Sequence, residues 1–79
     1  MKLRVLVTPK TGVLDPEGRA IQSALADLGY SEVAELRTGK IIELELATTD
    51  PEAARAQAAE MCEKLLANPV IEQYEIELV

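Results

Sequence analysis

The tripeptide Asp-Pro-Glu occurs twice in this chain, at residues 15–17 and 50–52, and each copy predicts the start of a helix. The aspartate can accept hydrogen bonds from the free N–H groups of the first turn, proline suits the first helical position, and the glutamate faces the positive end of the helix dipole. Gly29 predicts the end of the first helix, and Asn68-Pro69 predicts the end of the second. The expected apolar stripes are Ala20, Ile21, Ala24, Leu25 and Leu28 in the first helix and Ala54, Ala58, Met61, Cys62, Leu65 and Leu66 in the second.

Alternation of apolar and polar side chains predicts strands on either side of these helices. The first strand covers residues 2–8, and the last covers residues 70–79. Between the helices, residues 33–37 and 40–47 are expected to form a hairpin that turns at Thr38-Gly39. The register of this hairpin stays open, because turns of different length place different side chains on the buried face.

The resulting order β-α-β-β-α-β predicts an α+β fold of the ferredoxin-like, split βαβ type. In this two-layer sandwich, a four-stranded antiparallel sheet carries both helices on one face, and the first strand is central. On the helix-free face, basic residues of the first strand then lie between acidic residues of its neighbours, where opposite charges stabilise by ~0.2–1 kcal/mol per pair. These charged residues are Lys2 and Arg4 with Glu43, Glu45, Glu75 and Glu77.

Several features favour association with another chain. Leu6, Ile71 and Val79 lie on the helix-free face, which favours its burial by a partner over the alternative of a solvated face. A core of this size supplies only about 3–5 kcal/mol of net stability. One cysteine, Cys62, and no histidine exclude an internal disulfide and a tetrahedral zinc cage as further sources of stability. We therefore expect a single domain over residues 1–79 that forms oligomers.

Charge and composition exclude other classes of protein. A formal net charge of −6 would repel nucleic acid, and with only Tyr30 and Tyr74 as aromatic residues there is no platform for stacked bases. The alternating N-terminal residues do not resemble a signal peptide, and no stretch approaches the ~20 apolar residues of a membrane span. A soluble cytoplasmic protein with a free thiol is expected.

No set of residues predicts catalysis, a cofactor site or a metal site. The usual proton carrier near neutral pH is missing, because the chain lacks histidine. Cys62 falls within an apolar helical stripe, which favours a core residue over a nucleophile. The acidic pairs are explained by strand alternation, and no calcium-binding loop is present. Thr38-Gly39-Lys40 lacks the earlier glycine of a phosphate-binding loop and is interpreted as a hairpin turn.

Basic residues near the predicted loop ends are the candidates for contact with a partner. Lys10, Arg19, Arg37 and Lys40 can gather there and meet an acidic partner or a phosphate, while the alternative is dispersed solubilising charge. The loop at residues 9–14 and the turn at residues 37–40 predict partner contacts through Lys10, Arg37, Gly39 and Lys40.

Three stretches resemble the PurS-type subunits of phosphoribosylformylglycinamidine synthase. They are residues 13–25, which open with Val-Leu-Asp-Pro-Glu-Gly, residues 37–44, which open with Arg-Thr-Gly-Lys, and residues 61–72 followed by Tyr74. Together they span nearly the whole chain in matching order and spacing. Pro9 and the alanine-rich start of the second helix depart from the pattern, outside these stretches.

The resemblance implies a non-catalytic subunit of an ATP-dependent ligase of purine biosynthesis. In that enzyme, a large synthetase subunit holds ATP, magnesium and formylglycinamide ribonucleotide, and a glutaminase subunit supplies ammonia from glutamine. The PurS-type subunit is implied to bridge these two, as a dimer or tetramer, and to support ammonia transfer without catalytic residues or a cofactor of its own.

The alternative function is a stand-alone regulatory domain of the same fold that binds a small ligand, such as glutamine, ATP or a purine nucleotide. A hydrolase of the acylphosphatase type is disfavoured, because residues 9–12 lack the repeated glycines of an anion-binding loop.

Overall fold

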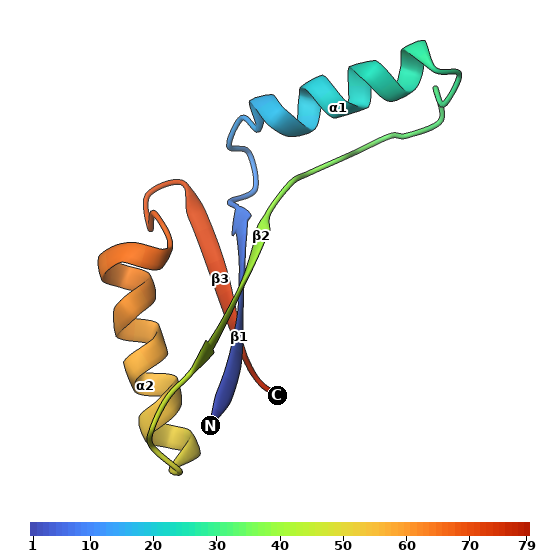
Figure 1. Cartoon of the computed structure of the whole chain (residues 1–79). Helices are drawn as coiled ribbons and strands as arrows, with labels where there is room; N and C mark the ends of the chain where they lie inside the picture. The colour runs from blue at the N-terminus through green and yellow to red at the C-terminus, as the bar shows by residue number, and fades with distance from the viewer.

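The computed structural model describes residues 1–79 and contains three strands, two helices and one π-helical turn (Figure 1). In chain order these are β1 (Lys2–Pro9), α1 (Pro16–Asp27), β2 (Lys40–Glu45), α2 (Pro51–Met61), η1 (Cys62–Leu66) and β3 (Glu72–Leu78). Both helices start at the predicted positions: Asp15 accepts a hydrogen bond from Gly18 N–H at 3.0 Å, and Asp50 accepts one from Glu52 N–H at 3.1 Å. α1 also ends as predicted, before Gly29, which takes a φ of 101°. Neither helix has the length and apolar character that a membrane span requires.

β1 is the central strand of the sheet, between β2 and β3, and it pairs antiparallel with both. The predicted central position of the first strand is therefore confirmed. Arg4 lies opposite Glu43 on one side and Glu77 on the other. Lys2 lies opposite Glu45. The predicted charge pairing is therefore present for Arg4 on both sides and for Lys2 on the β2 side, whereas Glu75 lies opposite Leu6 instead of a basic residue.

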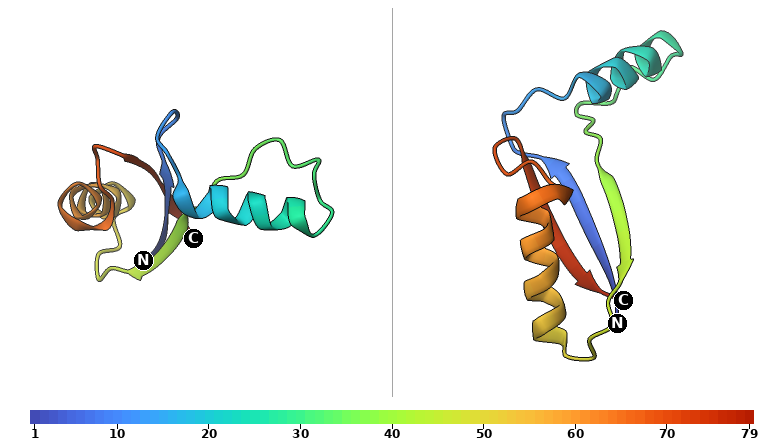
Figure 2. Two further views of the ribbon diagram at one scale, coloured as in Figure 1. Left: turned by 90° about the horizontal axis from the view of Figure 1, so that it is seen from above. Right: turned by 60° about the vertical axis from the view of Figure 1, so that its left-hand side comes forward.

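The core lies between the sheet and α2, which packs across one face (Figure 2). The central strand contributes three fully buried side chains, and the second helix contributes small ones, so that helix and sheet approach closely. These residues are Leu3, Val5 and Val7 from β1 and Ala54, Ala58 and Cys62 from the helix. Because apolar stabilisation scales with the buried area, such small side chains contribute little each.

The last turn of the second helix is wider than an α-helical turn. In η1 the N–H of Ala67 donates to the carbonyl of Cys62, five residues earlier, at 3.1 Å. This spacing directs Leu66 and Ala67 toward the core and leaves Leu65 83% exposed. The prediction that Leu65 belongs to the buried stripe is wrong, because a period of 3.6 residues does not continue through η1.

The predicted hairpin does not form. Residues 33–39 belong to no strand; they return alongside α1 and continue into β2 without a turn at Thr38-Gly39 (Figure 1). Hydrogen bonds tie this segment to α1 and its cap instead: Gln22 Nε2 donates to Val33 O at 2.8 Å, and Thr38 N–H donates to Asp15 Oδ2 at 2.7 Å. The sheet therefore has three strands rather than the predicted four.

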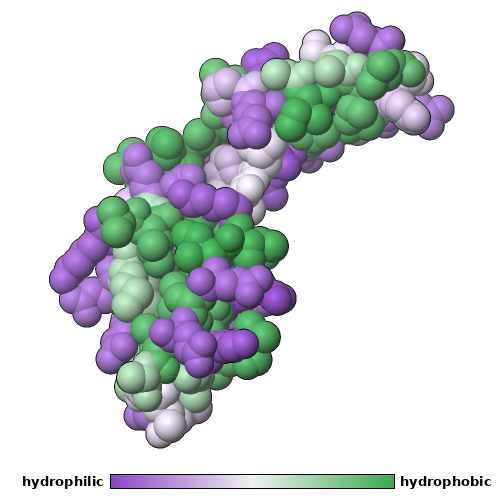
Figure 3. Space-filling model, viewed as in Figure 1, coloured by the Kyte–Doolittle hydropathy of each residue, from purple (hydrophilic) through white to green (hydrophobic).

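α1 projects away from the sheet, so the prediction of two helices on one face is wrong for the single chain (Figures 1 and 2). We refer to residues 10–39, which carry α1, as the arm. With the arm, the chain measures 49 × 24 × 15 Å along its principal axes. The apolar stripe of α1 is largely uncovered: Leu28 is 74% exposed, Ile21 is 39% exposed, and hydrophobic atoms extend along the arm in Figure 3.

Ala58 tests how closely α2 packs on the sheet. Ala58→Leu is expected to destabilise the fold by about 1–3 kcal/mol, because the larger side chain must displace Leu3 or the helix. Ala56→Leu, at an exposed position of the same helix, is the matched control and should change the free energy of unfolding by less than about 0.5 kcal/mol. Urea denaturation measures both, and equal effects would contradict the close packing.

Candidate interaction surface at the base of the arm

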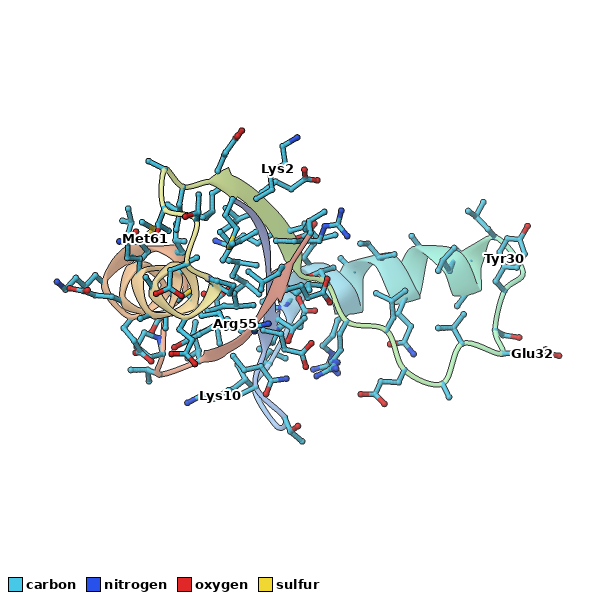
Figure 4. The ribbon with its side chains drawn as sticks, turned by 90° about the horizontal axis from the view of Figure 1, so that it is seen from below. Lys2, Lys10, Tyr30, Glu32, Arg55 and Met61 are labelled. Carbon is cyan, nitrogen blue, oxygen red and sulfur yellow. The ribbon has the colours of Figure 1, made fainter.

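The four residues predicted to contact partners lie where the arm joins the sheet. Two segments meet there: residues 9–15 leave β1, and residues 36–40 return to β2. Lys10 and Arg37 come from opposite segments, and both line a cavity of about 260 Å³ together with Arg19 of α1. Figure 4 shows Lys10 near the sheet, with Tyr30 and Glu32 at the far end of the arm. Their role in partner binding stays a prediction.

The side chains of Lys10 and Arg37 are exposed, and each is anchored by a backbone carbonyl. Lys10 Nζ donates to Pro69 O at 2.5 Å and ties the start of the arm to the loop before β3. Arg37 Nη1 donates to Pro9 O at 3.4 Å. The one ion pair of the structure lies elsewhere, on the second helix, so neither cation is in contact with a carboxylate of its own chain. Lys10 and Arg37 therefore form no ion pair, although the charge of Arg37 helps to lower the pKa of the nearby Asp15.

Gly39 occupies a position that admits no side chain. A Cβ atom there would lie 2.6 Å from Val7 O and 3.0 Å from Thr8 Cγ2. Glycine thus allows the returning segment to run against β1. The next residue, Lys40, is exposed and pairs with Val7 across the two strands. The glycine predicted to form a turn is therefore required for close approach of two segments.

Asp15 links the two segments at the base of the arm. Its Oδ1 accepts a hydrogen bond from Gly18 N–H at 3.0 Å, and its Oδ2 accepts one from Thr38 N–H at 2.7 Å. The Thr38 hydroxyl lies 3.1 Å from each oxygen and can donate to either. These donors, led by Thr38 N–H and then Gly18 N–H, hold the pKa of Asp15 below its ordinary value. The sequence predicted the helix cap and missed the contact with Thr38.

A second surface feature lies between α2 and β2. A groove of about 450 Å³ is lined by apolar side chains from the second helix and from the edge strand, and these are Leu44, Met61, Leu65 and Leu66. Glu60 and Lys64 also line it and form an ion pair of 2.6 Å. The chain therefore exposes two apolar surfaces, the groove and the stripe of α1.

Two further side chains have shifted pKa values, Cys62 and Tyr74, and both lie close to Glu63. Cys62 is buried, and this burial, with the charge of Glu63, raises the pKa of its thiol, so that the reactive thiolate is disfavoured. Tyr74 donates to Glu63 Oε1 at 3.0 Å, and this hydrogen bond is the main cause that raises the pKa of Tyr74. No three His, Cys, Asp or Glu side chains lie close enough together to hold a metal ion.

The hydrogen bonds of Asp15 predict a loss of stability in acid. Because the pKa of Asp15 is lower in the folded chain than in the unfolded chain, its contribution is complete above about pH 4 and disappears as the pH falls through the lowered pKa. Asp15→Asn should therefore destabilise the chain at about pH 7, and its difference from the unaltered chain should shrink at about pH 2.5. Urea denaturation followed by circular dichroism measures this gap, with the exposed Asp27→Asn as control. If Asp15→Asn lowered the free energy of unfolding equally at both pH values, the stabilising role of the ionised Asp15 carboxylate would be contradicted.

Comparison with known proteins identifies the family. The family model described as phosphoribosylformylglycinamidine (FGAM) synthase, PurS, matches residues 2–79. The chain is similar to the PurS subunits of phosphoribosylformylglycinamidine synthase from Methanocaldococcus jannaschii, with 47% identity over 98% of this chain and 93% of the relative, and from Bacillus subtilis, with 47% identity over 98% and 90%. Among solved structures it is similar to PurS from Methanocaldococcus jannaschii, with a TM-score of 0.85 and 47% identity over 96% of this chain and 92% of that chain. A chain of PurLQS from Thermotoga maritima gives a TM-score of 0.88 and 36% identity over 99% and 95%. The chain therefore belongs to the PurS family and is a subunit of phosphoribosylformylglycinamidine synthase, an enzyme of purine biosynthesis.

Proposed function

We propose that this chain supplies binding surfaces, and no reactive group, to phosphoribosylformylglycinamidine synthase. It bridges the glutaminase and synthetase subunits as an oligomer and supports the transfer of ammonia between them. The observation that carries this proposal is the arm, whose apolar stripe is exposed in the single chain. Such a stripe is stabilised when another surface removes it from water.

The chain carries a groove of similar apolar character that its own arm does not reach. The arm leaves the sheet where β1 ends and points away from α2, whereas the groove lies between α2 and β2 (Figure 1). A second copy can place its α1 in this groove and receive the arm of the first copy in return, which gives a closed two-fold arrangement. Each sheet then carries two helices on one face, one from each copy.

β2 offers a further contact to an exchanged arm. It is an edge strand, so its outward N–H and C=O groups have no partner in the sheet. Residues 33–37 of a second copy can add there as a fourth strand. The four-stranded sandwich predicted from the sequence then forms between two copies rather than within one.

The helix-free face, with Leu6 and Ile71, is the candidate surface for a further contact that would make a tetramer.

Contacts with the other subunits are assigned to the base of the arm. Lys10, Arg37 and Lys40 present exposed positive charges there, in a chain of net charge −6, and Gly39 keeps the returning segment against β1. Acidic side chains of a partner would meet these charges. In this proposal ATP, magnesium and glutamine act in the other subunits, this chain holds no cofactor, and the assembly is cytoplasmic.

A bridge supports ammonia transfer for a chemical reason. Ammonia released into water is protonated and diluted before it reaches a second active site, so an enclosed route favours its use. A connector that holds two active sites in fixed relation can complete such a route with its surface alone. The absence of a proton carrier from this chain is compatible with that role.

Reconstitution tests the bridging role. Adding this chain to purified synthetase and glutaminase subunits should raise glutamine-dependent amidine formation by at least about tenfold, which corresponds to about 1.4 kcal/mol of activation free energy, and should raise ammonia-dependent formation less. Cys62→Ala should retain the full effect, because the thiol is buried in the core. Unchanged glutamine-dependent turnover would contradict the proposal, and saturable binding of glutamine, ATP or a purine nucleotide to the chain alone would favour the regulatory alternative.

Sedimentation equilibrium tests the exchange of arms. Leu28→Glu is expected to raise the dissociation constant of the oligomer by at least about tenfold, because it places a charge in the apolar contact. Ser23→Glu adds the same charge on the opposite side of α1 and should leave the dissociation constant nearly unchanged. A monomeric unaltered chain, or equal effects of the two substitutions, would count against the exchange.

A further inference from the structure

We propose that Asp15 and Thr38 form a clamp that sets the direction of the arm and so prepares α1 for docking on a second copy. This inference rests on the proposed exchange of arms. The clamp connects the segment that leaves the sheet with the segment that returns to it, two parts of the chain that are 23 residues apart. It therefore acts at the base, where rotation of the whole arm would begin.

Asp15 makes more contacts than a helix cap requires. Asp50, at the equivalent position of the second Asp-Pro-Glu motif, accepts a hydrogen bond from Glu52 N–H and bonds to no distant segment. Asp15 makes the corresponding bond to Gly18 with one oxygen and uses the other for Thr38 N–H at 2.7 Å. Hydrogen bonds to an ionised carboxylate are about twice as strong as those between neutral groups. The additional contact is thus specific to the helix that forms the arm.

Packing around the clamp restricts the same two segments. A Cβ atom at Gly18 would lie 2.5 Å from Asp15 Oδ2 and 2.9 Å from Leu36 O, so the start of α1 lies directly against the returning segment. A Cβ atom at Gly39 would lie 2.6 Å from Val7 O, so the returning segment lies directly against β1. The carboxylate is therefore part of a continuous contact from helix to sheet. A rotation of the arm would break this contact.

Restricting the arm before it docks favours association. A freely jointed arm samples many directions and loses that freedom when α1 enters the groove of a second copy, and this loss weakens binding. A clamped arm has lost most of that freedom already, so more of the apolar contact energy appears as affinity. Asp15 is thus a positioning residue for assembly, in addition to its role as a helix cap.

Serine at position 15 separates the clamp from the cap. Serine is an N-cap residue comparable with aspartate, but its shorter side chain carries one oxygen and cannot serve Gly18 and Thr38 together. Asp50→Ser makes the same change in a motif without a clamp and is the matched control. Thr38→Val is a second variant that removes the hydroxyl contacts and keeps both the cap and the Thr38 N–H.

Two measurements test the clamp. In Asp15→Ser, hydrogen exchange of the Thr38 amide should accelerate by about tenfold while the Gly18 amide stays protected, and the dissociation constant of the oligomer should rise about tenfold, or about 1.4 kcal/mol. Thr38→Val should raise the dissociation constant by a smaller factor, about two- to threefold, since it loses only the hydroxyl contacts. Asp50→Ser should change neither quantity.

The outcomes distinguish this inference from the proposed function. An unaltered chain that associates, together with an Asp15→Ser variant of equal affinity and equal Thr38 protection, would overturn the clamp and leave the exchange of arms in place. A monomeric unaltered chain would overturn the exchange and, with it, the role of the clamp in association. Should Asp15→Ser fail to fold, the dissociation constant of Thr38→Val decides, and an affinity equal to that of the unaltered chain would overturn the clamp.

Discussion

Only one helix, α2, covers the sheet of this chain, although its sequence encodes two. The direction of the other helix, α1, is set by the segments that flank it. Because α1 lies beyond the end of β1, the core contains little more than the central strand and the small side chains of α2. Eight of the 79 residues are buried, and the larger of them are on β1. A chain with so small an interior gains much from a partner, since burying its exposed leucines and isoleucines adds to the same apolar contact. The external position of one helix thus accounts both for the limited core and for the surfaces available to other chains.

Local signals predicted the elements of the fold more reliably than their arrangement. The two Asp-Pro-Glu motifs, Gly29 and the alternation along β1 act within one or two turns of chain, so each could be identified from the sequence. Thr38-Gly39 has the composition of a turn, yet the glycine is required because Val7 O lies close to it. Leu65 follows the helical period, yet the π turn, which brings Ala67 into the core, exposes it. In both cases the outcome depends on a residue outside the pattern used for the prediction, Val7 for the turn and Ala67 for the helical stripe.

The residues of the candidate site could be predicted from the sequence, but the hydrogen bonds that hold its two segments together could not. Charges near loop ends indicated Lys10, Arg37 and Lys40, and these residues do lie at one end of the sheet. The hydrogen bonds from Thr38 to Asp15 could not be predicted, because they exist only once the chain has returned alongside α1. The subunit role came from resemblance over the whole chain, since a surface used for binding leaves no short motif of the kind that catalysis requires.

Because the arm is long, a small rotation at its base moves its far end by a large distance. A 12-residue helix is about 18 Å long, so an angular error of about 10° at its start displaces its far end by about 3 Å. Such a displacement equals the length of a hydrogen bond and is enough to misalign side chains at the tip, where Tyr30 and Glu32 lie (Figure 4). A few hydrogen bonds near residue 15 therefore govern the mechanical accuracy of a protrusion many times larger than themselves.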